Sequence, residues 1–144
     1  YRSQILFRFT ITARNPDILA FWEPGAPGYE IRRESLEGVA KRGFATSVSI
    51  EPMLDSGDIF GLVEELSPSV SHSIWIGLMN KIQERVPSDS DRIRKEIARI
   101  EAGQRDEKIR FIYGRLKKNP LIRWKESIKN VVGLSEAPRP GLDI

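Results

Sequence analysis

The sequence contains no cysteine and only one histidine, His72. Disulfides, thiolate metal sites and cysteine nucleophiles are therefore excluded within these 144 residues, and one imidazole cannot build a histidine-rich metal site. Any metal ion held here would need oxygen ligands, or ligands from outside this chain.

Long apolar runs are missing as well. No stretch approaches the ~18 consecutive apolar residues of a membrane-spanning helix, and no basic-then-apolar leader opens the sequence. We therefore expect no membrane partner and a cytoplasmic location. The composition, with 40% hydrophobic and 30% charged residues, is that of a folded globular domain.

Two segments, 5–14 and 44–55, show the polar and apolar alternation of strands with two unlike faces. The apolar face carries Phe7, Phe9, Ile11, Ala13, Val48 and Ile50, and the polar face carries Arg8, Thr10, Thr12, Arg14, Ser47, Ser49 and Glu51. Parallel strands covered by helices are usually apolar on both faces. The polar face is therefore expected to line a lumen or cleft.

Strands and helices alternate over the first part of the chain. The patterns predict parallel strands at 5–13, 44–51 and 73–78, in adjacent order, with helices at 30–42 and 56–66 between them. Right-handed crossovers would place both helices on one side of the sheet. We therefore predict an α/β fold, namely a partial (β/α) barrel fragment with parallel strands, followed by a C-terminal helical region.

The remaining segments differ in character. The proline-containing stretch from Asn15 to Glu30 is expected to be a long irregular loop with one helical turn around Asp17 to Phe21. Beyond residue 80 the apolar spacing is helical only, and predicts helices within 91–102, 109–116 and 121–131.

These patterns divide the chain into three parts. We expect a barrel segment at 1–82, a helical extension at 83–133 and an extended tail at 134–144.

Basic residues are concentrated in the second part of the chain. Residues 81–132 hold 15 Lys and Arg against 8 Asp and Glu, whereas residues 1–80 hold 7 against 10. A basic block attracts phosphates, so nucleic acid is a possible partner, although many such blocks are solvated helix faces.

Several polar residues follow the predicted strand ends, where parallel α/β folds bind ligands. Pro52 ends the second strand just after Glu51, and a buried Glu51 would need a donor such as Arg8 or Arg14, either in a ligand site or in a purely structural pair. The predicted substrate-binding residues at this mouth are Arg14, Glu23, Asn80 and Lys81.

Five motifs occur in a recognisable order: FTITAR, EPGAP with Arg33 following, AKRGFAT, SVSIEPML and WIGLMNK. With these, the chain resembles over residues 5–81 the C-terminal half of a radical S-adenosylmethionine enzyme of the spore photoproduct lyase and DNA repair photolyase-like group. The helical remainder resembles that group only loosely.

The resemblance implies a lumen that holds S-adenosylmethionine beside a four-iron, four-sulfur (4Fe-4S) cluster. In that reading the cofactor-binding residues are Thr10, Thr12, Ser49 and Glu51. The three cysteines of the family's CxxxCxxC motif and its Gly-Gly-Glu motif are absent, so the cluster ligands are expected outside this chain. The expected partner is the missing N-terminal half of the barrel or a second copy of this chain.

Three functions remain open from the sequence. The first is the C-terminal portion of a radical enzyme acting in DNA repair or nucleic-acid modification. The second is a non-catalytic nucleic-acid-binding module that uses the basic helices. The third is a half-barrel of an unrelated metabolic enzyme.

Overall fold

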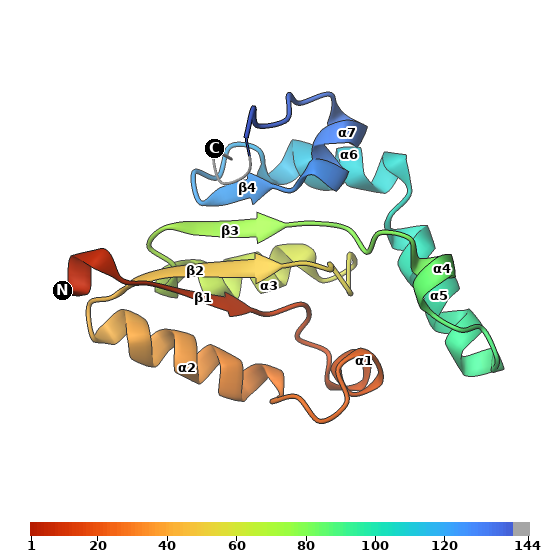
Figure 1. Ribbon diagram of the computed structural model, residues 1–144, viewed down its shortest axis with the longest axis horizontal. Helices are drawn as coiled ribbons and strands as arrows, with labels where there is room; N and C mark the ends of the chain where they lie inside the picture. Colours follow the sequence, from red (N-terminus) through yellow and green to blue (C-terminus); the bar gives the residue numbers. More distant parts are fainter. Residues whose placement is uncertain (140–144) are drawn as a thin grey trace.

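A four-stranded parallel sheet in the order β1-β2-β3-β4 forms the centre of the computed structural model, which describes residues 1–139 (Figure 1). The strands are β1 (Leu6–Thr10), β2 (Ala45–Ile50), β3 (Ser73–Ile76) and β4 (Ile122–Trp124). The helices are α1 (Pro16–Trp22), α2 (Tyr29–Lys41), α3 (Ile59–Leu66), α4 (Ile82–Arg85), α5 (Asp91–Gly103), α6 (Asp106–Leu116) and α7 (Glu126–Val132), with short 3-10 turns at Arg2–Gln4 and Ser67–Ser69. The predicted α/β fold with parallel strands in adjacent order is confirmed.

The fourth strand was not expected, and the prediction of helices only beyond residue 80 is wrong at β4. Ile122 and Trp124 pair with Ile74 and Ile76 of β3, and α7 begins only at Glu126. Ile122 and Trp124 lie two residues apart and are both buried, as in a strand. A strand of three residues is too short to show this alternation against the helical spacing around it.

The segment expected to be a loop contains the helix α1. The Asn15 side-chain oxygen accepts hydrogen bonds from the backbone N–H groups of Asp17 and Ile18, and Pro16 occupies the first helical position. Capping and a preset proline φ angle therefore extend the expected single turn into a helix of seven residues.

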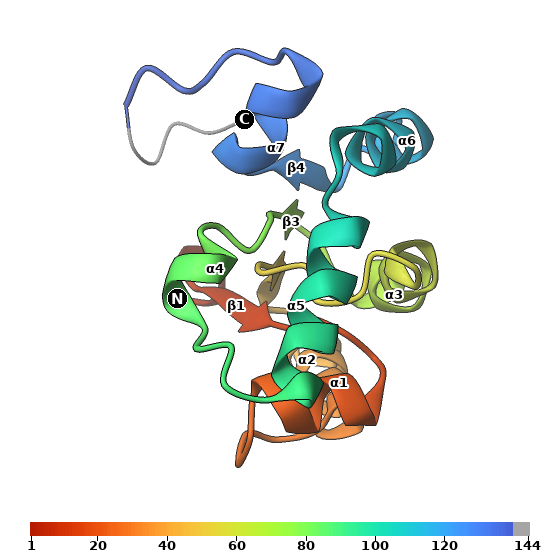
Figure 2. The same ribbon diagram turned by 90° about the vertical axis from the view of Figure 1, so that its right-hand side faces the viewer.

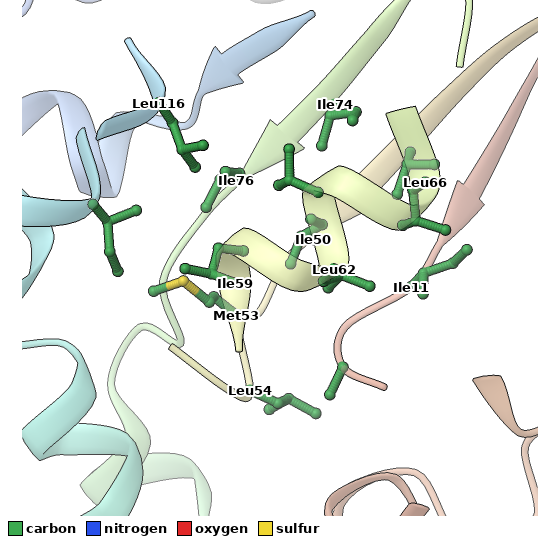
Figure 3. Packing of buried hydrophobic residues seen from close by; sticks show 14 of the residues in the cluster. Ile11, Ile50, Met53, Leu54, Ile59, Leu62, Leu66, Ile74, Ile76 and Leu116 are labelled. Carbon is green, nitrogen blue, oxygen red and sulfur yellow. The ribbon is translucent and has the colours of Figure 1, made fainter. Parts of the chain in front are cut away.

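Helices α2, α3 and α6 lie on one side of the sheet (Figure 2). Val48, Ile50 and Ile76 have no exposed surface, and they point toward these helices as the alternation predicted. Figure 3 shows Ile50, Ile74 and Ile76 of the sheet packed near Ile59, Leu62 and Leu66 of α3. The crossover helices therefore bury the apolar strand face and leave the other face to polar side chains.

The other elements are placed around this sheet. Figure 2 looks onto the carboxyl ends of the strands, and α5 lies in front of them. β1 forms one edge of the sheet, with exposed apolar side chains at Ile5, Leu6 and Phe7. No helix within residues 1–139 is long and apolar enough to cross a membrane. The expected tail has no helix or strand from 134 to 139, and residues 140–144 lie outside the described part.

Candidate functional site

The polar face of the sheet is arranged in rows set by the strand register. One row joins Arg8, Ser47 and Ser73, and the next joins Thr10, Ser49, Trp75 and Arg123. The hydroxyl oxygens of the buried Ser47 and Ser73 are 3.0 Å apart, and the Ser73 oxygen is 2.8 Å from His72 Nδ1. The two serine hydroxyls of the first row are therefore satisfied by internal hydrogen bonds, and His72 takes part in them.

Beyond these rows, toward the carboxyl ends of the strands, the carboxylate of Glu51 lies where a side chain of residue 77 would begin. A Cβ atom at residue 77 would lie 2.9 Å from the Glu51 carboxylate carbon and 2.9 Å from Lys125 Cγ. A side chain at this position would thus displace both groups. Because Gly77 has no side chain, Glu51 and Lys125 can lie next to each other on the polar face, at the carboxyl ends of β2, β3 and β4.

Glu51 is half-buried, and its side chain makes no hydrogen bond or ion pair with any residue among 1–139. The expected pairing with Arg8 or Arg14 is wrong. The Arg8 guanidinium carbon lies 6.0 Å from the centre of the Trp75 ring, and Arg14 binds acidic groups of the loop and helix after β2. The Glu51 oxygens are therefore free to accept hydrogen bonds from a ligand.

Arg14 has three hydrogen bonds to carboxylates. Its Nε donates to Asp58 Oδ2 at 2.7 Å, its Nη2 donates to Asp58 Oδ1 at 2.5 Å, and its Nη1 donates to Glu65 Oε2 at 2.7 Å. Arg33 also pairs with Glu65. The hydrogen bond from Arg14, followed by that from Arg33, lowers the pKa of Glu65, and the Asp58 and Glu65 carboxylates raise the pKa of Arg14. Arg14 thus ties the segment between β1 and α1 to α3, and its donors are occupied by Asp58 and Glu65.

Thr12 and Glu23 are brought together, but they satisfy each other. The buried Thr12 hydroxyl donates to Glu23 Oε1 at 3.1 Å, and Arg32 Nη2 donates to Glu23 Oε2 at 2.6 Å. Arg32 Nη1 also donates to the backbone oxygen of Thr10 at 3.1 Å. This cluster fixes the loop before α2. The other two predicted cofactor residues remain accessible, because Thr10 is exposed on the polar face and Ser49 is half-buried there.

A cavity of about 330 Å³ opens at the carboxyl ends of β2 and β3. Its lining residues are Trp22, Glu51, Pro52, Leu78, Met79, Asn80, Arg85 and Val86. The structure therefore brings the predicted residues Glu51 and Asn80 together and adds Arg85 and Trp22, which the sequence did not indicate. Arg85 lies on a helix of four residues that has no recognisable pattern.

Lys81 lies outside this cavity. It has a left-handed φ of 55° at the start of α4, and its Nζ is 3.9 Å from Glu84 Oε2. It lines a separate hollow with Glu101 and Gln104. The predicted substrate residues thus divide among three sites. Asn80 lines the mouth beside Glu51, Arg14 and Glu23 together line a second cavity of about 660 Å³ next to α1 and the start of α2, and Lys81 lines the hollow at α4.

Trp75 occupies the middle of the polar face. Its indole is only 8% exposed, with Lys125 Nζ 5.2 Å and the Arg8 guanidinium carbon 6.0 Å from the ring centre. Within residues 1–139 its buried Nε1 has no hydrogen-bond partner. Two cations on one indole make this part of the face attractive to anionic groups.

Helix α5 forms a wall beside this mouth and is held by bonds to backbone atoms. Arg99 Nη1 donates to the backbone oxygen of Leu54 at 2.7 Å, and the Gln104 side chain both accepts from the N–H and donates to the C=O of Met79. Trp22 Nε1 donates to Glu96 Oε2 at 2.9 Å. The hydrogen bonds from Arg99 and then Trp22 lower the pKa of Glu96, so this carboxylate is charged at neutral pH.

Residues 1–139 contain no group of three or more His, Cys, Asp or Glu side chains placed to hold a metal ion. No family model, curated protein or solved structure matches the chain.

Proposed function

We propose that this chain is the C-terminal portion of a radical S-adenosylmethionine enzyme that acts on nucleic acid. In this proposal the sheet is a segment of a (β/α) barrel, and its polar face is the lumen. The observation that carries the proposal is the unpaired Glu51 carboxylate, which lies across Gly77 at the carboxyl ends of the strands. The motif resemblance over residues 5–81 and the helices on one face of the sheet support it.

The polar groups of the lumen fit the nucleoside side of S-adenosylmethionine. The oxygens of Glu51 can accept hydrogen bonds from both hydroxyls of a ribose, and the Ser49 and Thr10 hydroxyls of the neighbouring row can donate or accept. The Thr12 hydroxyl donates to Glu23, so only its oxygen lone pairs remain for a ligand. S-adenosylmethionine would supply radical chemistry, and these residues would bind and orient it.

The residues of this chain do not fit an iron-sulfur cluster. The sequence has no cysteine, and His72 Nδ1 is bonded to Ser73. We therefore assign no electron-transfer step to this chain, and the cluster ligands belong to another segment. That segment, or a second copy of this chain, would pair with the exposed edge strand β1 and cover Ile5, Leu6 and Phe7.

The mouth cavity is the proposed substrate side. Asn80 and Arg85 both line it, and their side chains carry N–H donors, which suit phosphate oxygens or base edges. The cavity also has apolar walls at Leu78, Met79 and Val86. A nucleotide presented at this mouth would lie next to a cofactor bound at Glu51.

The proposal implies a longer form that also carries the N-terminal half of the barrel, and the test compares that form with the 144-residue chain. Both are reconstituted anaerobically with iron and sulfide, and visible absorbance and reductive cleavage of S-adenosylmethionine are followed. We expect cluster formation and cleavage only in the longer form. A colourless longer form without cleavage contradicts the proposal, and so does a cluster formed by the 144-residue chain itself.

Glu51→Gln in the longer form tests the site itself. Loss of one carboxylate acceptor is expected to weaken S-adenosylmethionine binding roughly tenfold, while cluster absorbance stays unchanged. The matched control is Glu64→Gln, which makes the same change at an exposed position of α3. Equal binding by Glu51→Gln and wild type would remove Glu51 from the site.

A further inference from the structure

A cationic aromatic cluster lies on the helix side of the sheet, on the opposite side from the polar face. We call it the α3–α6 patch, and it consists of Phe60, Lys108, Phe111 and Arg115. Phe111 is 50% exposed, and its ring meets that of Phe60 edge to face, with centroids 5.9 Å apart and an interplanar angle of 82°. Phe111 is thus a large ring held in place by a second ring and open to solvent.

Two cations flank these rings. The Arg115 guanidinium carbon is 4.9 Å from the Phe60 centroid and 5.9 Å from that of Phe111, and Lys108 Nζ is 5.5 Å from Phe111. No carboxylate among residues 1–139 forms an ion pair with Lys108 or Arg115, whereas the nearby Asp106 pairs with Arg110. The patch therefore has uncompensated positive charge, within a stretch, 105–118, that holds six Lys and Arg against two Asp and Glu.

Gly114 leaves space beside Phe111. It lies inside α6, one turn after Phe111, and a Cβ atom there would meet nothing within 4 Å. Glycine in an exposed helix interior costs about 1 kcal/mol relative to alanine, and Gly114 has no positive φ angle that would require it. The surface at Gly114, one turn from Phe111 on α6, is therefore open to a ligand.

We infer that the α3–α6 patch binds single-stranded nucleic acid. An exposed base stacks on Phe111 in the space beside Gly114, and neighbouring phosphates lie against Lys108 and Arg115. A paired base cannot offer its face to the ring, so single strands are preferred over duplex. An exposed aromatic ring complements the base of a nucleotide, and unpaired cations complement its phosphate. This inference does not depend on the cofactor proposal, because binding at the patch needs no cofactor.

The experiment measures the fluorescence anisotropy of a labelled oligothymidine of about 15 nucleotides, and of the same strand in a duplex, with the 144-residue chain. Titrations run from about 50 to about 200 mM salt. We expect the single strand to bind more tightly than the duplex. Phe111→Leu, which keeps the side chain apolar, is expected to weaken single-strand binding roughly tenfold.

Two further variants separate stacking from charge and from folding. Lys108→Gln with Arg115→Gln should lower the affinity and reduce the slope of log K against log salt by about 0.7 for each phosphate that the variant no longer neutralises. Gly114→Leu should raise the melting temperature through helix propensity and yet weaken binding, because the new side chain fills the space beside the ring. The matched control, Arg94→Gln with Lys95→Gln on α5, removes the same charge elsewhere and should change binding little.

Several results would overturn the inference. These are no binding at the lowest salt, equal affinity of wild type and Phe111→Leu, or an equal loss of affinity in the α5 control. An acidic peptide that displaces the oligonucleotide at lower concentration than an unlabelled single strand does would assign the patch to a protein partner instead. Circular dichroism of every variant confirms that it is folded.

Discussion

Gly61 of α3 faces the guanidinium of Arg14 so closely that a Cβ atom at residue 61 would lie 3.0 Å from Arg14 Cζ and 3.0 Å from Asp58 Oδ1. A side chain here would push against the Arg14–Asp58 ion pair, which joins the segment after β1 to the start of α3. The glycine is therefore needed for the pairing, although it lies within a helix, where alanine is usually preferred.

We predict that Gly61→Ala destabilises the protein by about 1–2 kcal/mol, because the clash outweighs the gain in helix propensity. Gly114→Ala is the matched control, since its Cβ meets nothing and should stabilise by about 0.5–1 kcal/mol. Urea denaturation of both variants gives the comparison. If the free energy of unfolding rose in both variants, Arg14 would have moved aside at no cost in stability, which would contradict the prediction.

Gly77→Ala is predicted to remove the candidate cofactor site with little effect on stability. The methyl group would displace the Glu51 carboxylate and the Lys125 stem, which are side-chain groups that can move. If the proposed function holds, S-adenosylmethionine binding by the longer form that it implies should fall roughly tenfold, with a change in stability below about 1 kcal/mol. Gly38→Ala in α2, where a Cβ meets only Arg42 Nη1 at 4.0 Å, is the control. Unchanged binding in Gly77→Ala would place the ligand elsewhere.

The lowered pKa of Glu65 predicts a pH dependence of stability. The folded-state pKa lies below the ordinary value of 4.5, because Arg14 and then Arg33 hydrogen-bond the ionised form. This stabilisation is therefore present above the unfolded-state pKa and is lost as the pH falls through the folded-state pKa. Glu65→Gln should cost about 1 kcal/mol near neutral pH, after allowance for partial exposure, and nothing in acid.

Denaturation curves of wild type, Glu65→Gln and Glu64→Gln across the acidic range provide the measurement. Glu64 is the exposed neighbour and should show no such pH-dependent difference from wild type. A Glu65→Gln deficit that persists at the lowest pH would show that the variant perturbs packing instead of removing a charged acceptor.

The edge strand gives a prediction about association. Leu6 and Phe7 are exposed on β1, which has no partner strand on its outer side within residues 1–139. We expect the 144-residue chain to self-associate at high concentration, and Phe7→Lys to reduce this, because a lysine on an edge strand opposes pairing. Light scattering after size exclusion measures the mass. A wild type that stays monomeric would contradict pairing with a second copy.

Much of the fold could be predicted because the strands are regular. Val48 and Ile50 alternate with Ser49 and Glu51, and that period of two was enough to assign the buried and polar faces. β4 could not be predicted, because three residues show no period of their own and its pairing with β3 depends on tertiary contacts. Local pattern therefore predicted the strands that are long enough to show one.

The site was predicted less completely, because its contacts join distant residues. Arg14 pairs with Asp58 and Glu65, 44 and 51 positions away, and no local spacing indicates such partners. Glu51 and Asn80 could be placed at the mouth because both follow strand ends. Arg85 could not, since its position depends on how the loop after β3 folds against α5.

The three tryptophans lie in three different parts of the fold, so intrinsic tryptophan fluorescence can report on each part separately. Trp124 packs with the core on the helix side and is 5.3 Å from the Tyr113 ring, Trp22 lines the mouth cavity, and Trp75 lies on the polar face beneath Arg8 and Lys125. A ligand bound on the polar face would displace those cations and change the emission of Trp75, while Trp124 would keep its spectrum. Single-tryptophan variants with phenylalanine at the other two positions would thus report, without any label, which face of the sheet a ligand touches.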